Sequence, residues 1–168
     1  MAISSIGISS SDNYALISSV TPTAATAAVN FTSLGLHKKF MLTFNAVGLA
    51  TTGIPRILIN NDTAVDQYIS ARTSDNFSAS NIEISGETGF RINSTAATTT
   101  SIDDGFFVVK NTDTTTAHFV EAASFQCQGR RIRYDNGFYK ASAVCSQINV
   151  VVSTTFDGTG TIKLYGVK

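Results

Sequence analysis

The stretch Lys39-Phe40-Met41-Leu42-Thr43-Phe44-Asn45-Ala46-Val47 alternates between apolar and more polar side chains. Successive side chains of a β-strand point to opposite faces, so this period of two predicts a strand with one buried face. The residues expected to face a core are Phe40, Leu42, Phe44 and Ala46, and those expected on the other face are Met41, Thr43 and Asn45.

Similar strand patterns fill most of the chain, whereas helix-period patterns are nearly absent. The further strands that we expect are residues 54–59, 68–73, 82–85, 89–93, 106–110, 117–128, 130–134, 138–144, 148–153 and 161–167. Asp135-Asn136-Gly137 predicts a hairpin turn, since Asn-Gly tolerates the positive φ angles of a type I′ turn. About ten short strands separated by turn residues predict an all-β fold, an antiparallel β-sandwich.

The chain of 168 residues has no composition shift that would mark a second domain. We expect an N-terminal docking arm at residues 1–13, with Ile3, Ile6 and Ile8 as its apolar contacts, and a single sandwich domain at residues 14–168. The tracts 21–28 and 94–101 are expected as surface loops or loosely paired edges, the first with a candidate short helix at residues 24–28. Glu87-Thr88-Gly89 is expected as a tight connection between two strands.

The composition is unusually poor in charge. Charged residues make up 14% of the chain and hydrophobic residues 43%, against about 25% charged residues in an average soluble domain. Ser, Thr and Asn replace the missing charges, and burying uncharged polar groups against a partner costs less than burying charges. This composition indicates either a packing surface or a β protein whose exposed strand faces use Thr.

The net charge is +0 and the pI about 6.7, which gives no electrostatic footprint for nucleic acid or an anionic membrane. No apolar run approaches the ~18 residues of a membrane helix, and residues 1–13 lack the basic and apolar regions of a signal peptide. Cys127 and Cys145 lie among apolar residues, which favours buried thiols, although a single bridge between them stays open.

Motifs for chemistry are missing. His37 and His118 each stand apart from other metal ligands, and we expect His37 in a solvated loop. A nucleophile elbow, a P-loop and a dinucleotide fingerprint are absent. Asn60-Asn61-Asp62 with Asp66 forms an oxygen-rich loop, for which a plain turn is favoured over a calcium site. We therefore expect a protein that is not an enzyme and that uses no cofactor and no metal.

The sequence contains a single basic cluster, at residues 129–134. Its Arg and aromatic residues, together with those of the expected hairpin, define a candidate patch for a glycan or a protein partner. The patch residues are Arg131, Arg133, Tyr134, Phe138 and Tyr139. The competing interpretation is an edge strand protected from aggregation by its charges.

The C-terminal sequence Gly-Thr-Gly-Thr-Ile-Lys-Leu-Tyr-Gly-Val-Lys, residues 158–168, resembles the closing "GTIKLYG" strand of a family of tailed-bacteriophage virion proteins. Residues 146–153 resemble the preceding strand of that family, and residues 29–32 and 40–44 are similar to its "FxFT" segment and the strand after it. The resemblance covers about a third of the chain and implies a jelly-roll on the virion surface, often trimeric. It brings no catalytic residues.

The resemblance implies two functions. The first is a capsid decoration (cement) protein that docks on other virion proteins, such as the major capsid protein, and stabilises the particle. The alternative is a tail-fibre or baseplate module that binds a host cell-surface glycan, which the lack of Trp disfavours. Both place the protein in the virion, assembled in the host cytoplasm as a homo-oligomer, with a trimer favoured. We expect no nucleic-acid or membrane partner.

Overall fold

The computed structural model describes residues 14–34, 37–73, 82–92, 99–102, 105–110, 118–126, 131–141 and 143–167. Within these ranges the regular structure is fourteen β-strands and one short 3-10 turn, η1 (Val65–Gln67). All strand pairs are antiparallel. The expected all-β sandwich is confirmed.

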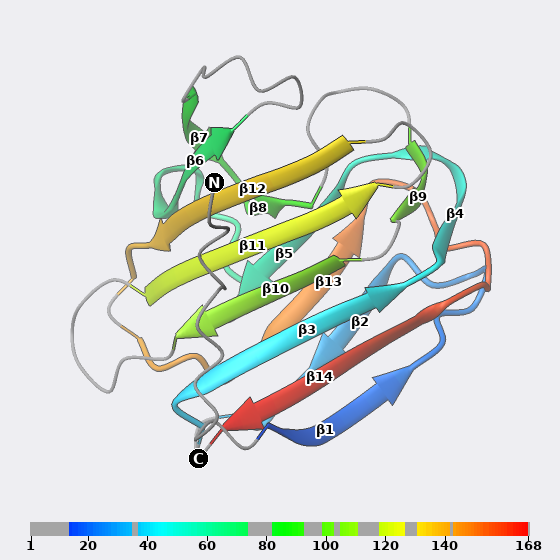
Figure 1. Cartoon of the computed structure of the whole chain (residues 1–168), viewed down its shortest axis with the longest axis horizontal. Helices are drawn as coiled ribbons and strands as arrows, with labels where there is room; N and C mark the ends of the chain where they lie inside the picture. The colour runs from blue at the N-terminus through cyan, green and yellow to red at the C-terminus, as the bar shows by residue number, and fades with distance from the viewer. Residues whose placement is uncertain are drawn as a thin grey trace, which may run out of the picture.

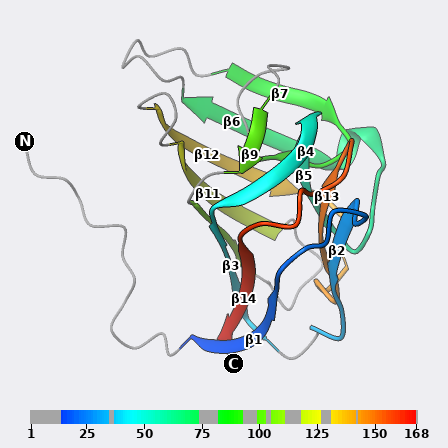
Figure 2. The same cartoon turned by 90° about the vertical axis from the view of Figure 1, so that its right-hand side faces the viewer.

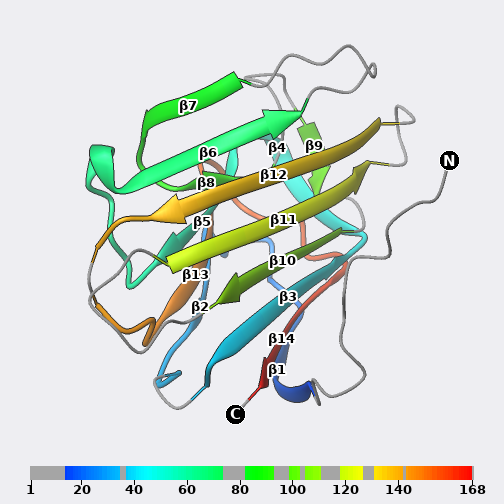
Figure 3. The same ribbon diagram turned by 60° about the vertical axis from the view of Figure 1, so that its left-hand side comes forward.

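A large sheet forms one layer of the sandwich (Figure 1). It contains eight strands in the order β1-β14-β3-β10-β11-β12-β6-β7. Figure 3 shows them side by side as one twisted sheet. Their bounds are β1 Ala15–Val20, β14 Thr161–Val167, β3 Lys39–Asn45, β10 Gly105–Lys110, β11 His118–Gln126, β12 Arg131–Tyr139, β6 Tyr68–Thr73 and β7 Ile82–Glu87.

A small sheet lies behind the large one (Figures 1 and 2). Its order is β2-β13-β5-β8, and a separate two-stranded ribbon pairs β4 with β9. The bounds are β2 Ala28–Phe31, β13 Ile148–Val152, β5 Pro55–Ile59, β8 Phe90–Arg91, β4 Val47–Gly53 and β9 Thr99–Ile102.

The core lies between the two sheets and follows the alternation of each strand. In β3, Phe40, Leu42 and Phe44 are each at most 4% exposed, as their spacing predicts. They share one cluster with Ile162 and Leu164 of β14, and burial of each such side chain contributes roughly 2 kcal/mol. The small sheet supplies the opposing side chains Val29, Phe31, Ile57, Ile59, Ile148 and Val150.

Strand β14 joins the two ends of the chain. It pairs with β1 on one side and with β3 on the other, so that Tyr165 is the partner of both Leu16 and Met41. Its last glycine, Gly166, packs beneath the His37 ring, where an added Cβ would lie 2.3 Å from His37 Cδ2. The glycine of the "LYG" ending therefore makes room for a side chain from the segment before β3.

The predicted hairpin at Asp135-Asn136-Gly137 is wrong. These residues lie within β12, where Asp135 pairs with Ala122 of β11 and with Arg72 of β6. A turn here would break hydrogen-bonded ladders on both sides of the strand, so the sheet overrides the local turn preference. The hairpin is instead formed by β11 and β12, which pair in register as far as Gln126 and Arg131.

Ala46 does not continue the buried face of β3. It has a φ of 49° and is exposed, because the chain bends there to leave the large sheet and begin β4. Residues 24–28 form no helix: Ala24 and Ala25 lie in a turn, and Ala28 begins β2. Of the tract 94–101, residues 99–101 belong to β9 (Thr99–Ile102), which pairs only with β4 and so agrees with the expected paired edge rather than with a loop.

The connection at residues 87–89 is short, as predicted, but the strands that it joins lie in different sheets. β7 belongs to the large sheet and β8 to the small one. An added Cβ on Gly89 would lie 2.5 Å from Leu58 Cδ2 and 3.1 Å from the Ile57 carbonyl oxygen. The glycine thus lets the chain cross closely over β5 between the two layers.

The turn before β14 provides a matched test of the closing strand. Gly158 and Gly160 have φ angles of +91° and +74°, but a Cβ on Gly158 would meet only the Ala24 nitrogen at 3.6 Å, whereas one on Gly160 would lie 2.3 Å from the Ala46 carbonyl oxygen. We expect Gly158→Ala to cost about 1 kcal/mol of backbone strain, and Gly160→Ala to cost about 2–4 kcal/mol. Urea unfolding measures both, and equal losses for the two variants would contradict this packing.

Candidate functional site

The candidate patch residues lie on one strand, β12, but on opposite faces of the sheet. Phe138 is 47% exposed, whereas Tyr139 is 2% exposed and belongs to the core. Arg131, Arg133 and Tyr134 are placed by their backbone pairing with β11, and their side chains lie outside what the structure describes. Tyr139 is therefore unavailable to a surface patch, and Phe138 is the member with a described, exposed side chain.

Tyr139 holds together a buried polar junction. Its hydroxyl donates to Asp62 Oδ2 at 2.8 Å, and its ring packs against Tyr68 with centroids 5.1 Å apart. The Tyr68 hydroxyl donates to the Asp62 carbonyl oxygen at 2.7 Å and accepts from the Ile59 amide at 3.1 Å. Burial raises the pKa of both tyrosines well above the ordinary value, so both remain neutral hydrogen-bond donors. The junction ties β5, β6 and β12 together.

The oxygen-rich loop at residues 60–62 uses its polar atoms within the fold. Asn60 Oδ1 accepts from the Ser146 and Gln147 amides at 2.9 and 3.2 Å, and Asn60 Nδ2 donates to the Val144 carbonyl oxygen at 3.0 Å. Asp62 Oδ1 accepts from the backbone amide two residues later at 2.8 Å. These bonds fit the plain turn that the sequence favours. The Asp66 side chain lies outside the described part, and within that part no three metal-ligating side chains gather.

His37 is half-buried rather than solvated. Its ring lies against Gly166 and 5.6 Å from the Phe40 ring, and its Nδ1 lies 3.4 Å from the Leu34 carbonyl oxygen. This is a packing role at the end of β14. His118 is placed only by its backbone, at the start of β11.

Cys145 is a buried thiol, as the sequence predicts. It donates to the Gln147 carbonyl oxygen at 3.7 Å, and burial raises its pKa to about 12. Such a thiol is an inert part of the core rather than a nucleophile. Cys127 lies outside the described residues, and so do Ile3, Ile6 and Ile8 of the expected docking arm.

The outer face of the large sheet carries the feature that sequence reasoning missed. A row of successive Cα partners crosses β1, β14, β3 and β10, and it consists of Leu16, Tyr165, Met41 and Val108. Along its own strand, each of these residues alternates with residues that face the core. This apolar row runs directly across four strands and is followed by Glu121 of β11. Leu16 is 56% exposed and Val108 is 8% exposed. An antiparallel sheet usually turns polar side chains to solvent, so an apolar row on its outer face indicates a contact surface.

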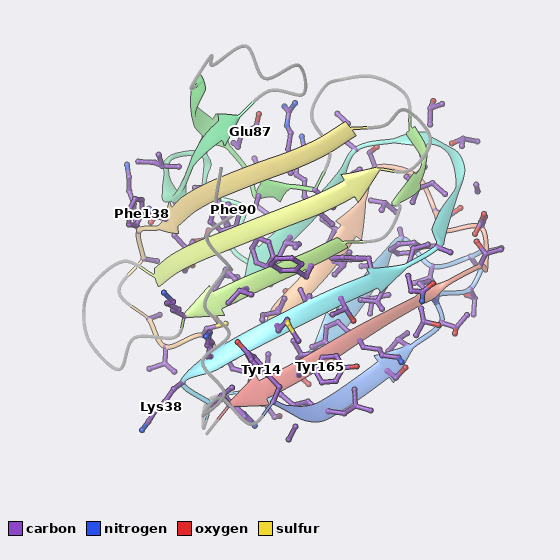
Figure 4. All side chains as sticks on the ribbon, in the orientation of Figure 1. Tyr14, Lys38, Glu87, Phe90, Phe138 and Tyr165 are labelled. Atoms are coloured by element: carbon purple, nitrogen blue, oxygen red, sulfur yellow. The ribbon has the colours of Figure 1, made fainter. Side chains whose placement is uncertain are left out.

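Basic residues flank the apolar row on both sides. On one side of the row, Lys39 and Lys110 are Cα partners and lie two residues along their strands from Met41 and Val108. On the other side, Lys163 lies two residues before Tyr165 and pairs with Thr43. The Lys39 ammonium lies 5.5 Å from the centre of the Tyr14 ring. Figure 4 shows Tyr14 and Tyr165 over the end of this face formed by β3 and β14. In the part of the chain that the structure describes, the small sheet covers only the opposite face (Figure 2).

A cluster of charged side chains lies on the outer face of the small sheet. Glu87, from the end of β7, is paired with Arg91 and lies 3.7 Å from Arg56 Nη2. Arg56 and Arg91 are Cα partners, so the carboxylate lies between two guanidinium groups. Their three side chains are at most 23% exposed, which makes this an ion-pair network that links the two sheets rather than a surface site.

Comparisons with known proteins give no family. No family model matches the chain, and neither a curated protein nor a solved structure is detectably similar to it. Among the described residues, the structure contains no helix with the length and hydrophobicity needed to span a membrane.

The buried junction gives a stability prediction. Tyr139→Phe removes the donor to Asp62 Oδ2 and leaves a partly buried carboxylate oxygen unsatisfied, which should cost about 1–3 kcal/mol in urea unfolding. Tyr165→Phe, on the outer face, is the matched control and should change stability by less than about 0.5 kcal/mol. If the two variants are equally stable, the junction does not hold the strands together.

The raised pKa values give a pH prediction. Cys145 and Tyr68 are uncharged when protonated, and their folded pKa values lie above the ordinary 9.0 and 10.0, so the unfolded chain loses these protons first. Their stabilisation is fully present below about pH 9 and is lost as the pH rises from there, at up to about 1.4 kcal/mol per pH unit for each group. The decline from pH 9 should be shallower in Cys145→Ala, measured by urea unfolding across the pH series. An unchanged slope would mean that the thiol ionises equally in both states.

Proposed function

We propose that this chain is a non-enzymatic structural protein of a tailed-bacteriophage virion, in first place a capsid decoration protein that docks on the particle surface and stabilises it. The observation that carries the proposal is the outer face of the large sheet, which no other described strand covers, with its apolar row of Leu16, Tyr165, Met41 and Val108. The closing-strand resemblance supplies the virion setting. The protein then acts in the virion as a homo-oligomer, with a trimer favoured, after assembly in the host cytoplasm.

The chemistry of this face describes its partner. An apolar row with lysines on both sides fits a surface that presents an apolar strip bordered by acidic residues, such as a face of the major capsid protein. The low charge of the chain, 14%, lowers the desolvation cost of burying such a broad face. The apolar row would supply the binding energy, and the lysines would fix the orientation.

The order of the strands supports the jelly-roll form of the sandwich. The last strand, β14, lies between β1 and β3, and the strand before it, β13, lies between β2 and β5. Strands β10 and β8 complete the two four-stranded layers, β1-β14-β3-β10 and β2-β13-β5-β8. This interleaving of early and late strands is what we would expect of the double Greek key of a jelly roll, and it supports that form of the sandwich. Strands β11, β12, β6 and β7 then extend one layer, which enlarges the outer face.

The contacts made by the polar residues that were candidates for a functional site also support a structural role. Asn60, Asp62 and Tyr139 bond to other parts of the fold, and His37 packs on Gly166. Each of these contacts stabilises a strand connection. The proposal therefore rests on surfaces rather than on reactive groups.

One observation favours the alternative function, a tail module that binds a host glycan. Phe138 is a large aromatic side chain, 47% exposed, on the same outer face as the apolar row. An exposed aromatic ring suits stacking on a sugar. Under this alternative, Phe138→Ala reduces adsorption to host cells, whereas under the decoration function it leaves adsorption unchanged.

Co-sedimentation with purified particles that lack this protein tests the docking face. We expect the wild-type chain to bind, and Tyr165→Glu to weaken binding at least tenfold, because it places a carboxylate in the apolar row opposite an acidic border. Binding should also weaken as salt is raised, since lysines flank the row.

Val144→Lys is the control, because Val144 is 47% exposed and lies outside the large sheet. Circular dichroism checks that both variants fold. Binding that survives Tyr165→Glu unchanged, in a folded protein, would rule out this face as the docking surface.

A further inference from the structure

The first strand leaves one edge of the large sheet open. In the described part, β1 pairs only with β14, so the backbone groups along its other edge have no strand partner. Its sequence, Ala-Leu-Ile-Ser-Ser-Val, contains no charged residue and no proline. Two of the five exposed large hydrophobic residues of the described part lie on it, Leu16 at 56% and Ile17 at 36%.

The other edges of the large and the small sheet are better protected. β7 carries Glu83 and Glu87, β8 has only two residues, one of them Arg91, and β2 has only four residues. Natural sheets protect their edges with charge, proline or short strands, because an open edge pairs with any suitable extended chain. A bulge between Leu16 and Ser18 is the one protective feature of β1. Among the described edges of the large and the small sheet, this edge is therefore best suited to accept another strand.

The chain itself contains a segment that matches this edge. Residues 3–6, Ile-Ser-Ser-Ile, repeat the pattern of residues 17–20, Ile-Ser-Ser-Val, within β1. The surrounding residues 1–13 contain a single charged side chain, Asp12, next to Asn13 and just before β1. The N-terminal segment thus has the same uncharged, β-compatible character as the strand beside which it would lie.

We infer that residues 2–8 of one copy add as an extra strand to the open edge of β1 in a neighbouring copy. This rests on the proposed function, which needs a homo-oligomer, and it names the acceptor of the N-terminal docking arm. The added strand would cover Leu16 and Ile17 and satisfy the edge by main-chain hydrogen bonds, as in other cases of strand addition.

The geometry limits how the copies are arranged. Residues 9–13 connect the donated strand to Tyr14, and five residues span at most about 17 Å. Each copy must therefore bring the start of its own β1 close to the β1 edge of its neighbour. Reciprocal exchange between two copies would give a dimer, whereas head-to-tail exchange closes into a ring such as the favoured trimer. If residues 2–8 instead folded back onto β1 of their own copy, they would become the new edge strand. That edge would again be uncharged and open to another chain.

Free protein in solution tests this strand exchange. Analytical ultracentrifugation should find an oligomer for the full chain and a monomer for a chain that begins at Tyr14, with the same β-sheet circular dichroism. A fluorescent peptide of residues 1–13 should then bind the shortened chain in an anisotropy titration, because the β1 edge has been vacated.

Two variants of the shortened chain locate the binding edge. Leu16→Lys should weaken peptide binding at least tenfold, whereas Val65→Lys, at a site 50% exposed but away from β1, should leave binding unchanged. The inference is overturned if the full chain is monomeric, if the shortened chain remains an oligomer, or if Leu16→Lys binds the peptide normally. No virion particle takes part in these measurements, so failure of strand exchange stays separate from failure of docking.

Discussion

The packing of the last strand between the first and the third is the constraint on which the structure depends. Strand β14 has partners on both sides, and its Ile162 and Leu164 are fully buried. It brings the C-terminal end of the chain against β1, and the paired residues Leu16 and Tyr165 are 149 positions apart in the sequence. Without β14, β1 would have no partner among the described residues, and the apolar row on the outer face would be interrupted.

The features around β14 follow from this constraint. Gly160 allows the chain to pass the Ala46 carbonyl oxygen, and Gly166 gives space to the His37 ring. The alternation of β14 places Lys163 and Tyr165 on the outer face, while Ile162 and Leu164 close the core. The same strand therefore stabilises the sandwich and forms part of the surface that we propose for docking.

The sequence allowed the strands with a strong local pattern to be predicted, and it failed where distant partners decide. The alternation of Phe40, Leu42 and Phe44 is visible in any window of the chain, and so is that of β14. The turn preference of Asp135-Asn136-Gly137 is equally visible, but two neighbouring strands override it. No local rule reports such a neighbour.

The candidate site was less predictable than the fold. Tyr139 looked like a patch residue because its partner, Asp62, is 77 positions away in the sequence. The apolar row was hidden for the same reason, since each of its residues comes from a different strand. Leu16 and Ile17, next to each other in a short polar segment, give no alternation that marks a strand. Their shared position at a sheet edge appears only once β14 is placed.

The location of the protein on an assembled particle tests the central claim most directly. A cryo-electron microscopy map of the virion, into which this sandwich is fitted, shows which face contacts the particle. We predict density for the protein on the capsid surface, with the outer face of β1, β14, β3 and β10 against the capsid. Density that leaves this face in solvent, or a particle without the protein, would contradict it.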